Sequence, residues 1–207
     1  MAIPQSSYIL HLSRDKKFAR IIAGQDPIAL NRHRDVHLHL CNSIMSQQLS
    51  TKVADIIRKR FLKLYSGKPS PEQILSTPHE TLRSIGLSGA KANYMHNVAR
   101  FAIEFGMDYR VLGKMNNEEV IEHLTKIKGV GRWTAEMLLI FTLAREDVFA
   151  VDDLGIQQAM ILVYNLDQSD KKKLKENMQR ISANWSPFRS FACLHLWRHK
   201  DLSKVTG

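Results

Sequence analysis

Residues 124–135 read Leu124-Thr-Lys-Ile-Lys-Gly-Val-Gly-Arg-Trp-Thr-Ala135, and residues 149–154 read Phe149-Ala-Val-Asp-Asp-Leu154. Apolar residues at helical spacing stand on both sides of Gly129 and Gly131, so the first stretch predicts two helices joined by a tight hairpin. The N–H groups of such a hairpin and of the helix start that follows form an anion site. Its flanking cations are Lys126, Lys128 and Arg132. A phosphate suits this site, and an ordinary helix corner with a C-cap glycine is the alternative.

The acidic pair in the second stretch, Asp152 and Asp153, stands one helix and a loop after the hairpin. An aspartate just before an amphipathic helix needs no function beyond capping that helix, which is the simpler interpretation. The connection is also short enough to bring this helix start back beside the hairpin, where a carboxylate could serve chemistry.

The chain has 207 residues, of which 44% are hydrophobic, so it can bury a sizeable core. Lys and Arg number 30 against 20 Asp and Glu, which gives a formal net charge of +10. A basic globular chain usually has a polyanionic partner, and nucleic acid is the first candidate. A soluble protein with a basic surface and no such partner is the alternative.

Two cysteines, Cys41 and Cys193, lie far apart within apolar helical patterns, which favours buried free thiols in a reducing compartment. The sequence has no four-cysteine cluster, which excludes a cysteine-ligated iron–sulfur cluster. The first residues lack the pattern of a signal peptide, and no apolar run is long enough to span a bilayer. We therefore expect a protein that is not secreted and has no membrane partner.

Helical patterns follow one another along the chain. A long amphipathic stretch covers residues 37–64. Helix starts are predicted at Thr77, with proline in the first helical position, at Ser88, and at Asn116 or Asn117. The other predicted helices lie near residues 72–75, 132–143, 152–163, 171–183 and 187–199.

Only residues 147–151 are β-like, and that segment is short, so we predict an all-α fold. We expect a single unit of two lobes. The first lobe covers roughly residues 37–145 and contains the hairpin at 126–131. The second combines the N-terminal segment with roughly residues 152–200.

Five motifs occur in the order found in one family. They are Ser43-Ile-Met-Ser-Gln-Gln-Leu-Ser50, Ile85-Gly-Leu-Ser-Gly-Ala-Lys91, Gly129-Val-Gly-Arg-Trp-Thr-Ala135, Val151-Asp-Asp-Leu-Gly155 and Trp185-Ser-Pro-Phe-Arg-Ser-Phe-Ala192. Over residues 37–198 the chain resembles the helix–hairpin–helix (HhH-GPD) DNA glycosylases, and among them the compact members of the 3-methyladenine DNA glycosylase II branch. The resemblance implies a two-lobed helical fold with its active site in the cleft between the lobes.

The resemblance implies a monofunctional DNA glycosylase that flips out alkylated purines, of the 3-methyladenine type, and excises them hydrolytically in base excision repair. It places the essential carboxylate on Asp153 and makes Asp152 the more variable position. Cleavage of the glycosidic bond builds positive charge on the deoxyribose, which a carboxylate stabilises. Because alkylation at N3 or N7 already charges the base, departure of the base needs no strong acid.

The resemblance also implies a base pocket of Trp133, Met137 and Trp197. At the position of Trp133, relatives that nick the strand carry a lysine that forms a Schiff base, so the tryptophan implies hydrolysis without lyase activity. Its ring offers stacking or cation–π contact to a methylated base, and core packing is the alternative. Some relatives have tyrosine where this chain has Met137, which leaves the base preference open. Trp197 belongs to an apolar helical stripe that could equally be core.

In the same family, the position of Gln48 fills the duplex where the flipped nucleotide has left. An exposed polar helix residue is the alternative. Lys91 resembles part of a second small anion site, and a solvated surface lysine is its simpler interpretation. The full set of phosphate-binding residues that the resemblance implies is Lys91, Lys128, Gly129, Val130, Gly131, Arg132 and Thr134.

No cofactor and no required metal are implied. Hairpin carbonyls in this superfamily can hold a monovalent cation, and by position these would be Thr125, Ile127 and Val130. The expected partner is double-stranded DNA containing alkylated bases, bound by a monomer in the cytoplasm or nucleoid of a bacterium or the nucleus of a eukaryote. Two alternatives remain: a non-catalytic DNA-binding protein that keeps the hairpin, and a glycosylase for another base lesion.

Overall fold

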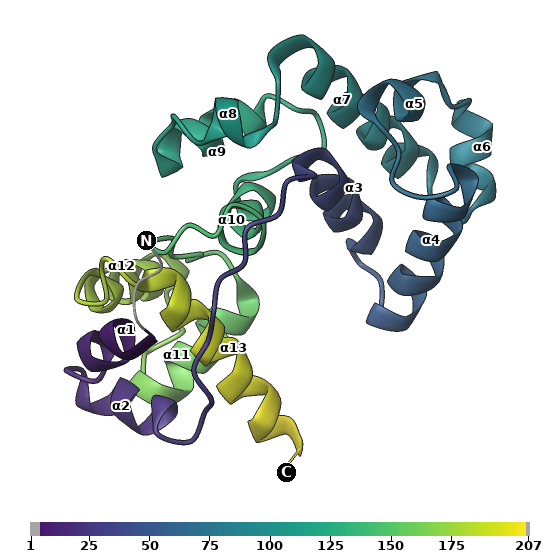
Figure 1. Cartoon of the computed structure of the whole chain (residues 1–207). Helices are drawn as coiled ribbons and strands as arrows, with labels where there is room; N and C mark the ends of the chain where they lie inside the picture. The colour runs from purple at the N-terminus through teal and green to yellow at the C-terminus, as the bar shows by residue number, and fades with distance from the viewer. Residues whose placement is uncertain (1–4, 206–207) are drawn as a thin grey trace. The chain divides into compact units, whose positions relative to one another are not determined.

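The structure is a computed structural model that describes residues 5–205, and every regular element in that range is an α-helix (Figure 1). The predicted all-α fold is confirmed, and the β-like residues 147–151 form no strand. The chain divides into two compact units. Unit 1 consists of Met1–Asn31 and Ala144–Gly207, and unit 2 of Arg32–Leu143. Among the described helices, none combines the length and apolar character that a bilayer crossing requires.

Unit 1 brings together helices from both ends of the chain. α11 packs against α13, and α2 packs against both of them. Aromatic contacts bind the two ends, with the Tyr8 ring stacked on Phe191 at 4.2 Å and Phe18 tilted on Trp185 at 4.8 Å. The sequence analysis predicts neither α1 nor α2. The helices are α1 (Gln5–Leu12), α2 (Lys16–Ile22), α11 (Leu154–Tyr164), α12 (Lys171–Ala183) and α13 (Arg189–Val205).

A fully buried histidine in α13, His195, also ties the N-terminal segment to this helix. Its Nδ1 lies 2.8 Å from Gln25 Oε1 and its Nε2 lies 3.4 Å from the Tyr8 hydroxyl, which accepts the Ile28 N–H at 2.6 Å. These partners fit a neutral ring that donates from Nδ1 and accepts at Nε2. Burial, followed by the positive charge of Arg198, lowers the pKa of His195 to about 4.

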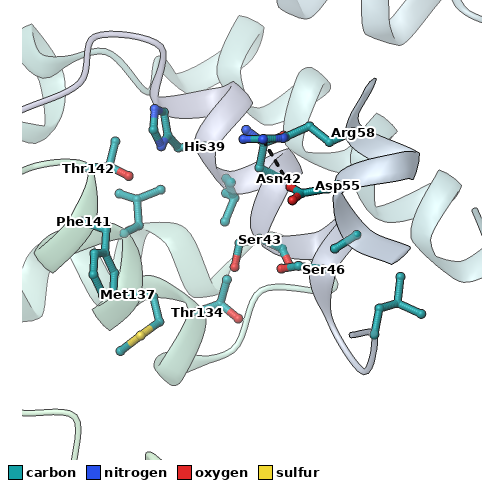
Figure 2. A pocket seen from close by; sticks show the side chains of 14 residues that line it. His39, Asn42, Ser43, Ser46, Asp55, Arg58, Thr134, Met137, Phe141 and Thr142 are labelled. Atoms are coloured by element: carbon teal, nitrogen blue, oxygen red, sulfur yellow. Dashed lines mark hydrogen bonds and ion pairs between the residues drawn. The ribbon is translucent and has the colours of Figure 1, made fainter. Parts of the chain in front are cut away.

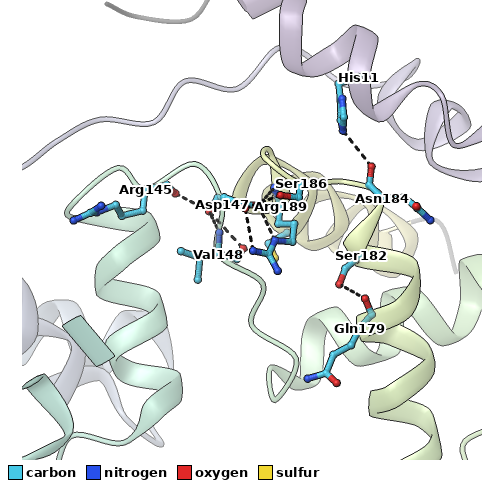
Figure 3. A network of polar contacts seen from close by, with 11 residues as sticks. His11, Arg145, Asp147, Val148, Gln179, Ser182, Asn184, Ser186 and Arg189 are labelled. Carbon is cyan, nitrogen blue, oxygen red and sulfur yellow. Dashed lines mark hydrogen bonds and ion pairs between the residues drawn. The ribbon is translucent and has the colours of Figure 1, made fainter. Parts of the chain in front are cut away.

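The start of α13 is bound to the loop that precedes α11 (Figure 3). Arg189 donates from Nε and Nη2 to the two carboxylate oxygens of Asp147, at 2.6 and 3.0 Å. Ser186 donates to the same carboxylate at 2.8 Å, and the Ser190 hydroxyl accepts the Val148 N–H at 3.0 Å. Burial raises the pKa of Asp147, but the bonds from Arg189 and Ser186 outweigh burial and leave this pKa below its usual range. The motif at 185–192 thus fixes the loop that leads to Asp153.

Unit 2 is built around α7, which packs against α3, α5 and α6. α3 also packs against α4 and α10, and α9 packs against α10. The helices are α3 (Val36–Ser46), α4 (Thr51–Leu64), α5 (Pro71–Ser76), α6 (His79–Ser84), α7 (Gly89–Phe105), α8 (Tyr109–Leu112), α9 (Asn117–Thr125) and α10 (Arg132–Phe141). Among them, the short α8 is not predicted by the sequence analysis.

Most predicted helix starts in unit 2 are confirmed. Ser88 caps α7 by accepting the Lys91 N–H, and Asn116 caps α9 in a capping box with Glu119. The start predicted at Thr77 is wrong. Thr77 is the C-cap of α5, and its hydroxyl donates to the Gln73 carbonyl at 2.7 Å, while Pro78 stands at the N-cap of α6.

The long helical stretch predicted for residues 37–64 is interrupted. It divides into α3 and α4, joined by the α3–α4 turn (residues 47–50). Ser50 caps the second helix by accepting the Val53 N–H at 3.4 Å. The backbone of Gln48 takes a φ of 57°, in the left-handed region, which ends the first helix without a glycine.

The predicted hairpin joins α9 to α10, and its two glycines serve different purposes. Gly129 has a φ of 106° and packs on Tyr94, so that an added Cβ would lie 2.3 Å from Tyr94 Cγ. Gly131 is the N-cap of α10, and a Cβ added there meets nothing within 4 Å. The Asn97 side chain donates to the Lys128 carbonyl at 3.1 Å, which also holds the hairpin on α7.

We predict that His195→Gln removes part of the acid sensitivity of the fold. The pKa of His195 is about 4 in the folded protein and near 6.5 in the unfolded chain. The neutral ring therefore contributes stability above pH 6.5, and this contribution is lost as the pH falls from 6.5 towards 4. This group alone should lower the wild-type free energy of unfolding by about 2 kcal/mol between pH 7 and pH 5. Urea denaturation at the two pH values measures the difference. In the control variant His33→Gln, which changes an exposed histidine, the free energy of unfolding should depend on pH as it does in the wild type. The same pH dependence in His195→Gln would contradict the role given to His195.

We predict that Gly129→Ala destabilises the protein far more than Gly131→Ala. The first places a methyl group against the Tyr94 ring at a φ that side-chain-bearing residues rarely adopt, at an expected cost above about 2 kcal/mol. The second enters open space and should cost below about 1 kcal/mol. Urea denaturation compares the two variants, and equal losses would refute the division of roles.

Candidate active site and nucleic-acid interface

Asp153 is the N-cap of α11 and is only 9% exposed. Its Oδ1 accepts two hydrogen bonds, from the Ile156 N–H at 2.9 Å and from the Trp197 indole N–H at 2.8 Å. The first is the helix-capping bond expected of an aspartate at this position. The second comes from α13 and fixes the side chain from another direction. The carboxylate is therefore buried and oriented in advance, as a catalytic group requires.

The neighbouring Asp152 has a different environment. It is exposed, and its carboxylate forms an ion pair with Lys175 of α12 at 2.5 Å. Of these two adjacent aspartates, Asp152 thus lies on the surface and Asp153 lies inside unit 1. Its burial makes Asp153 the better candidate of the two for a functional carboxylate.

Trp197 is half-buried and acts as a hydrogen-bond donor, a role that its aromatic character alone did not predict. Gly155 allows its close approach, since a Cβ added there would lie 3.0 Å from both Asp153 Oδ1 and Trp197 Cδ1. The sequence motif Val151-Asp-Asp-Leu-Gly155 is explained by these contacts. Its last residue leaves room for the tryptophan to reach the carboxylate.

In unit 2, Trp133 occupies the first turn of α10 and is 40% exposed. An indole packed wholly into the core would be covered, so a large part of this ring is open to a partner. Met137 lies one turn further along the same helix and is half-buried. The two side chains predicted for the base pocket in this unit therefore follow each other on one helix.

A groove of about 360 Å³ lies between α3, α4 and α10. Met137 and Phe141 of α10 line it from one side, and Ser43 and Ser46 of α3 line it from the other (Figure 2). The Thr134 side chain also lines this groove and is nearly buried. The sequence analysis did not select the polar residues of α3 that line it. Their spacing on one helical face was the available signal: His39, Asn42, Ser43 and Ser46.

The hairpin presents part of the predicted phosphate-binding set. Lys128 and Gly131 are exposed, whereas Val130 and Ile127 are buried. The Val130 N–H donates to the Ile127 carbonyl at 2.9 Å, which closes the turn. Lys128 and the N–H groups at the start of α10 are thus separated from Ile127 and Val130, the apolar residues that anchor the hairpin.

Arg132 already has acidic partners. Its Nη2 donates to Glu118 Oε1 at 2.6 Å, and its Nε donates to the buried Glu136 at 3.0 Å. The hydrogen bond from Arg132 lowers the pKa of Glu118. This arginine braces α9 against α10, and its predicted contact with a phosphate stays a prediction.

Lys91 and Gln48 are linked through the α3–α4 turn. The Lys91 ammonium donates to the Met45 carbonyl at 3.0 Å and to the Gln47 carbonyl at 2.7 Å. Gln48, the predicted wedge, is exposed at the tip of this turn. Two of the three N–H groups of Lys91 therefore point to the protein itself, and its phosphate contact remains a prediction.

The chain resembles known DNA repair proteins in sequence. The family model described as HhH-GPD superfamily base excision DNA repair protein matches residues 41–184. DNA-3-methyladenine glycosylase 1 of Schizosaccharomyces pombe is 32% identical over 194 residues, which cover 92% of this chain and 84% of that protein.

Solved structures resemble the chain in fold as well. The 3-methyladenine DNA glycosylase Mag1 of Schizosaccharomyces pombe, in complex with abasic DNA, superposes with a TM-score of 0.80 at 32% identity, over 92% of this chain and 95% of that one. The DNA-3-methyladenine glycosidase of Bacillus halodurans superposes with a TM-score of 0.83 at 32% identity, over 99% and 94% of the two chains. The chain belongs to the HhH-GPD superfamily of base excision DNA repair proteins.

Proposed function

We propose that this protein is a monofunctional DNA glycosylase that removes alkylated purines of the 3-methyladenine type. The observation that carries the proposal is the buried carboxylate of Asp153, held by two donors in a chain whose relatives are named 3-methyladenine glycosylases. Its substrate is double-stranded DNA, and its products are a free base and an abasic site.

Asp153 is proposed to stabilise the positive charge that develops on the deoxyribose as the glycosidic bond breaks, and to orient the attacking water. The bonds from Ile156 and Trp197 keep the carboxylate in place, so little reorganisation is needed at the moment of reaction. A base alkylated at N3 or N7 carries its own positive charge and leaves readily.

Trp133 and Met137, one turn apart on α10, are proposed to receive the flipped base. The exposed part of the Trp133 ring suits stacking against an electron-poor, positively charged base. The thioether of Met137 adapts its shape, which favours several alkylated bases over one. Gln48 is proposed to enter the duplex in place of the flipped nucleotide.

The residue at position 133 also limits the chemistry. Schiff-base formation with the sugar needs a nucleophilic amine, such as that of a lysine, and the indole at this position offers none. We therefore expect that the enzyme leaves the DNA strand intact after the base is released.

The hairpin is proposed to bind one DNA phosphate through the start of α10 and Lys128. The carbonyls of Thr125, Ile127 and Val130 would hold a monovalent cation, which would offset phosphate charge there. The Ile127 carbonyl already accepts the Val130 N–H, and its second lone pair remains for such an ion. We expect a monomer that acts where DNA is, in the nucleoid or the nucleus, and that needs no organic cofactor.

We predict that wild-type protein releases methylated purines from methylated duplex DNA and that Asp153→Asn is at least about 100-fold slower. Asparagine caps helices as well as aspartate does, so α11 should persist in the variant. Chromatography of released bases measures the first product, and an aldehyde-reactive probe measures abasic sites. Strand breaks should arise only after alkali.

Asp152→Asn provides the matched control because it changes the adjacent, exposed carboxylate and should keep the wild-type rate. Binding to methylated DNA without release of any base by the wild type would support a non-catalytic DNA-binding protein instead. Equal rates for Asp153→Asn and wild type would reject Asp153 as the catalytic group.

We predict that Trp197→Phe lowers the excision rate about tenfold, by a similar factor for every substrate base. Phenylalanine keeps an aromatic face but cannot donate to Asp153. Single-turnover rates on duplexes that each carry one lesion test this, with melting temperatures as the control for folding. A wild-type rate in Trp197→Phe, combined with a large loss in Trp197→Leu, would show that stacking alone matters.

A further inference from the structure

The α3–α4 turn holds an unusual backbone conformation at an exposed position. Gln48 has a φ of 57°, in the left-handed region that residues with a Cβ seldom adopt. Such a conformation persists only where the surroundings determine it. Within the turn itself, the Leu49 N–H donates to the Ser46 carbonyl at 3.1 Å.

A second set of contacts reaches the turn from α7. The Lys91 ammonium donates to the Met45 carbonyl at 3.0 Å and to the Gln47 carbonyl at 2.7 Å. These carbonyls lie at the C-terminal end of α3, where the helix dipole favours a positive charge. Burial lowers the pKa of Lys91, in agreement with an ammonium drawn partly away from water.

The motif Ile85-Gly-Leu-Ser-Gly-Ala-Lys91 fixes the backbone from which the Lys91 side chain extends. The Ser88 hydroxyl accepts the Lys91 N–H at 3.3 Å and so fixes the first turn of α7. His79 Nε2 lies 3.2 Å from the Gly89 carbonyl, which anchors the same turn from α6. Since α7 also packs on α3, the lysine stem starts from a fixed point and ends on the turn.

We propose that Lys91 is a positioning residue that holds the α3–α4 turn in the conformation presenting Gln48 to the duplex. This inference rests on the proposed function, in which Gln48 replaces the flipped nucleotide. Removal of the ammonium frees two carbonyls of the turn and lets the left-handed backbone at Gln48 relax. The insertion of Gln48 then loses its pre-organisation, so the rate of base excision falls while the affinity for undamaged DNA does not.

The rival role for Lys91 is a direct phosphate contact, and the two roles predict different salt dependences. A residue that neutralises a phosphate contributes about 0.9 to the slope of log affinity against log salt concentration. A lysine that donates to protein carbonyls contributes nothing to that slope. Binding of an undamaged duplex over a range of salt concentrations therefore separates them.

The experiment uses the full chain with Lys91→Met, which keeps the length of the side chain but removes its charge and its donors. We expect a single-turnover excision rate about tenfold below wild type, with an unchanged salt slope. Lys114→Met, which removes one exposed lysine after α8, is the matched control and should stay within about twofold of wild type. A salt slope lower by about 0.9 in Lys91→Met would overturn the proposal in favour of a phosphate contact.

A double-mutant cycle with Gln48→Ala tests whether Lys91 acts through Gln48. If it does, Lys91→Met costs less than about twofold once Gln48 is alanine. A full tenfold loss in the Gln48→Ala background would refute the coupling. Lys91→Gln, whose shorter neutral side chain keeps an amide donor, takes the place of Lys91→Met if the latter does not fold.

A measurement that does not depend on catalysis tests this inference separately from the proposed function. Amide hydrogen exchange of Leu49 reports the turn directly, and we expect faster exchange in Lys91→Met than in wild type. If wild type releases no base, the proposed function fails, while faster Leu49 exchange still supports the hold on the turn. Equal exchange in the two proteins would contradict the positioning role whatever the activity.

Discussion

The bidentate ion pair between Arg189 and Asp147 is the contact on which the candidate catalytic carboxylate depends. Arg189 stands at the first turn of α13, and Trp197 lies eight residues later on the same helix, about two turns away. One helix therefore holds the loop before α11 at its beginning, through Asp147, and at its end, through Asp153. Because both contacts come from one rigid element, the carboxylate is placed by the core of unit 1 and not by the loop that carries it.

Several basic side chains that a charge count assigns to DNA serve the protein itself. Arg189 binds Asp147, Arg132 bridges two glutamates, Lys175 pairs with Asp152, and Lys91 donates to carbonyls. The 30 lysines and arginines of the chain thus outnumber the cations available to phosphates. Exposed cations such as Lys128 remain for that purpose.

Local rules made much of this structure predictable from sequence. Ser88, Asn116 and Asp153 each cap a helix by accepting the N–H of the residue three positions later. Both partners of such a bond stand within a short stretch of sequence, so the sequence alone can predict it. Where the partner is remote, no pattern reveals it, as with Lys91 and the carbonyls of α3. The break at Gln48 was missed because apolar spacing continues across it and glycine is absent, although Ser50, the cap of α4, could have marked the second helix. The N-terminal helices were missed although Asp15, the cap of α2, could have marked one of them.

Unit 2 is a single stretch of chain, whereas unit 1 combines the first residues with the last. Tyr8 stacks on Phe191 and reaches His195, which a ribosome adds roughly 180 residues later. At roughly 5–20 residues per second, α1 and α2 remain without these partners for about ten to forty seconds after they emerge. The apolar faces of the first two helices are therefore without their native cover for that period of translation.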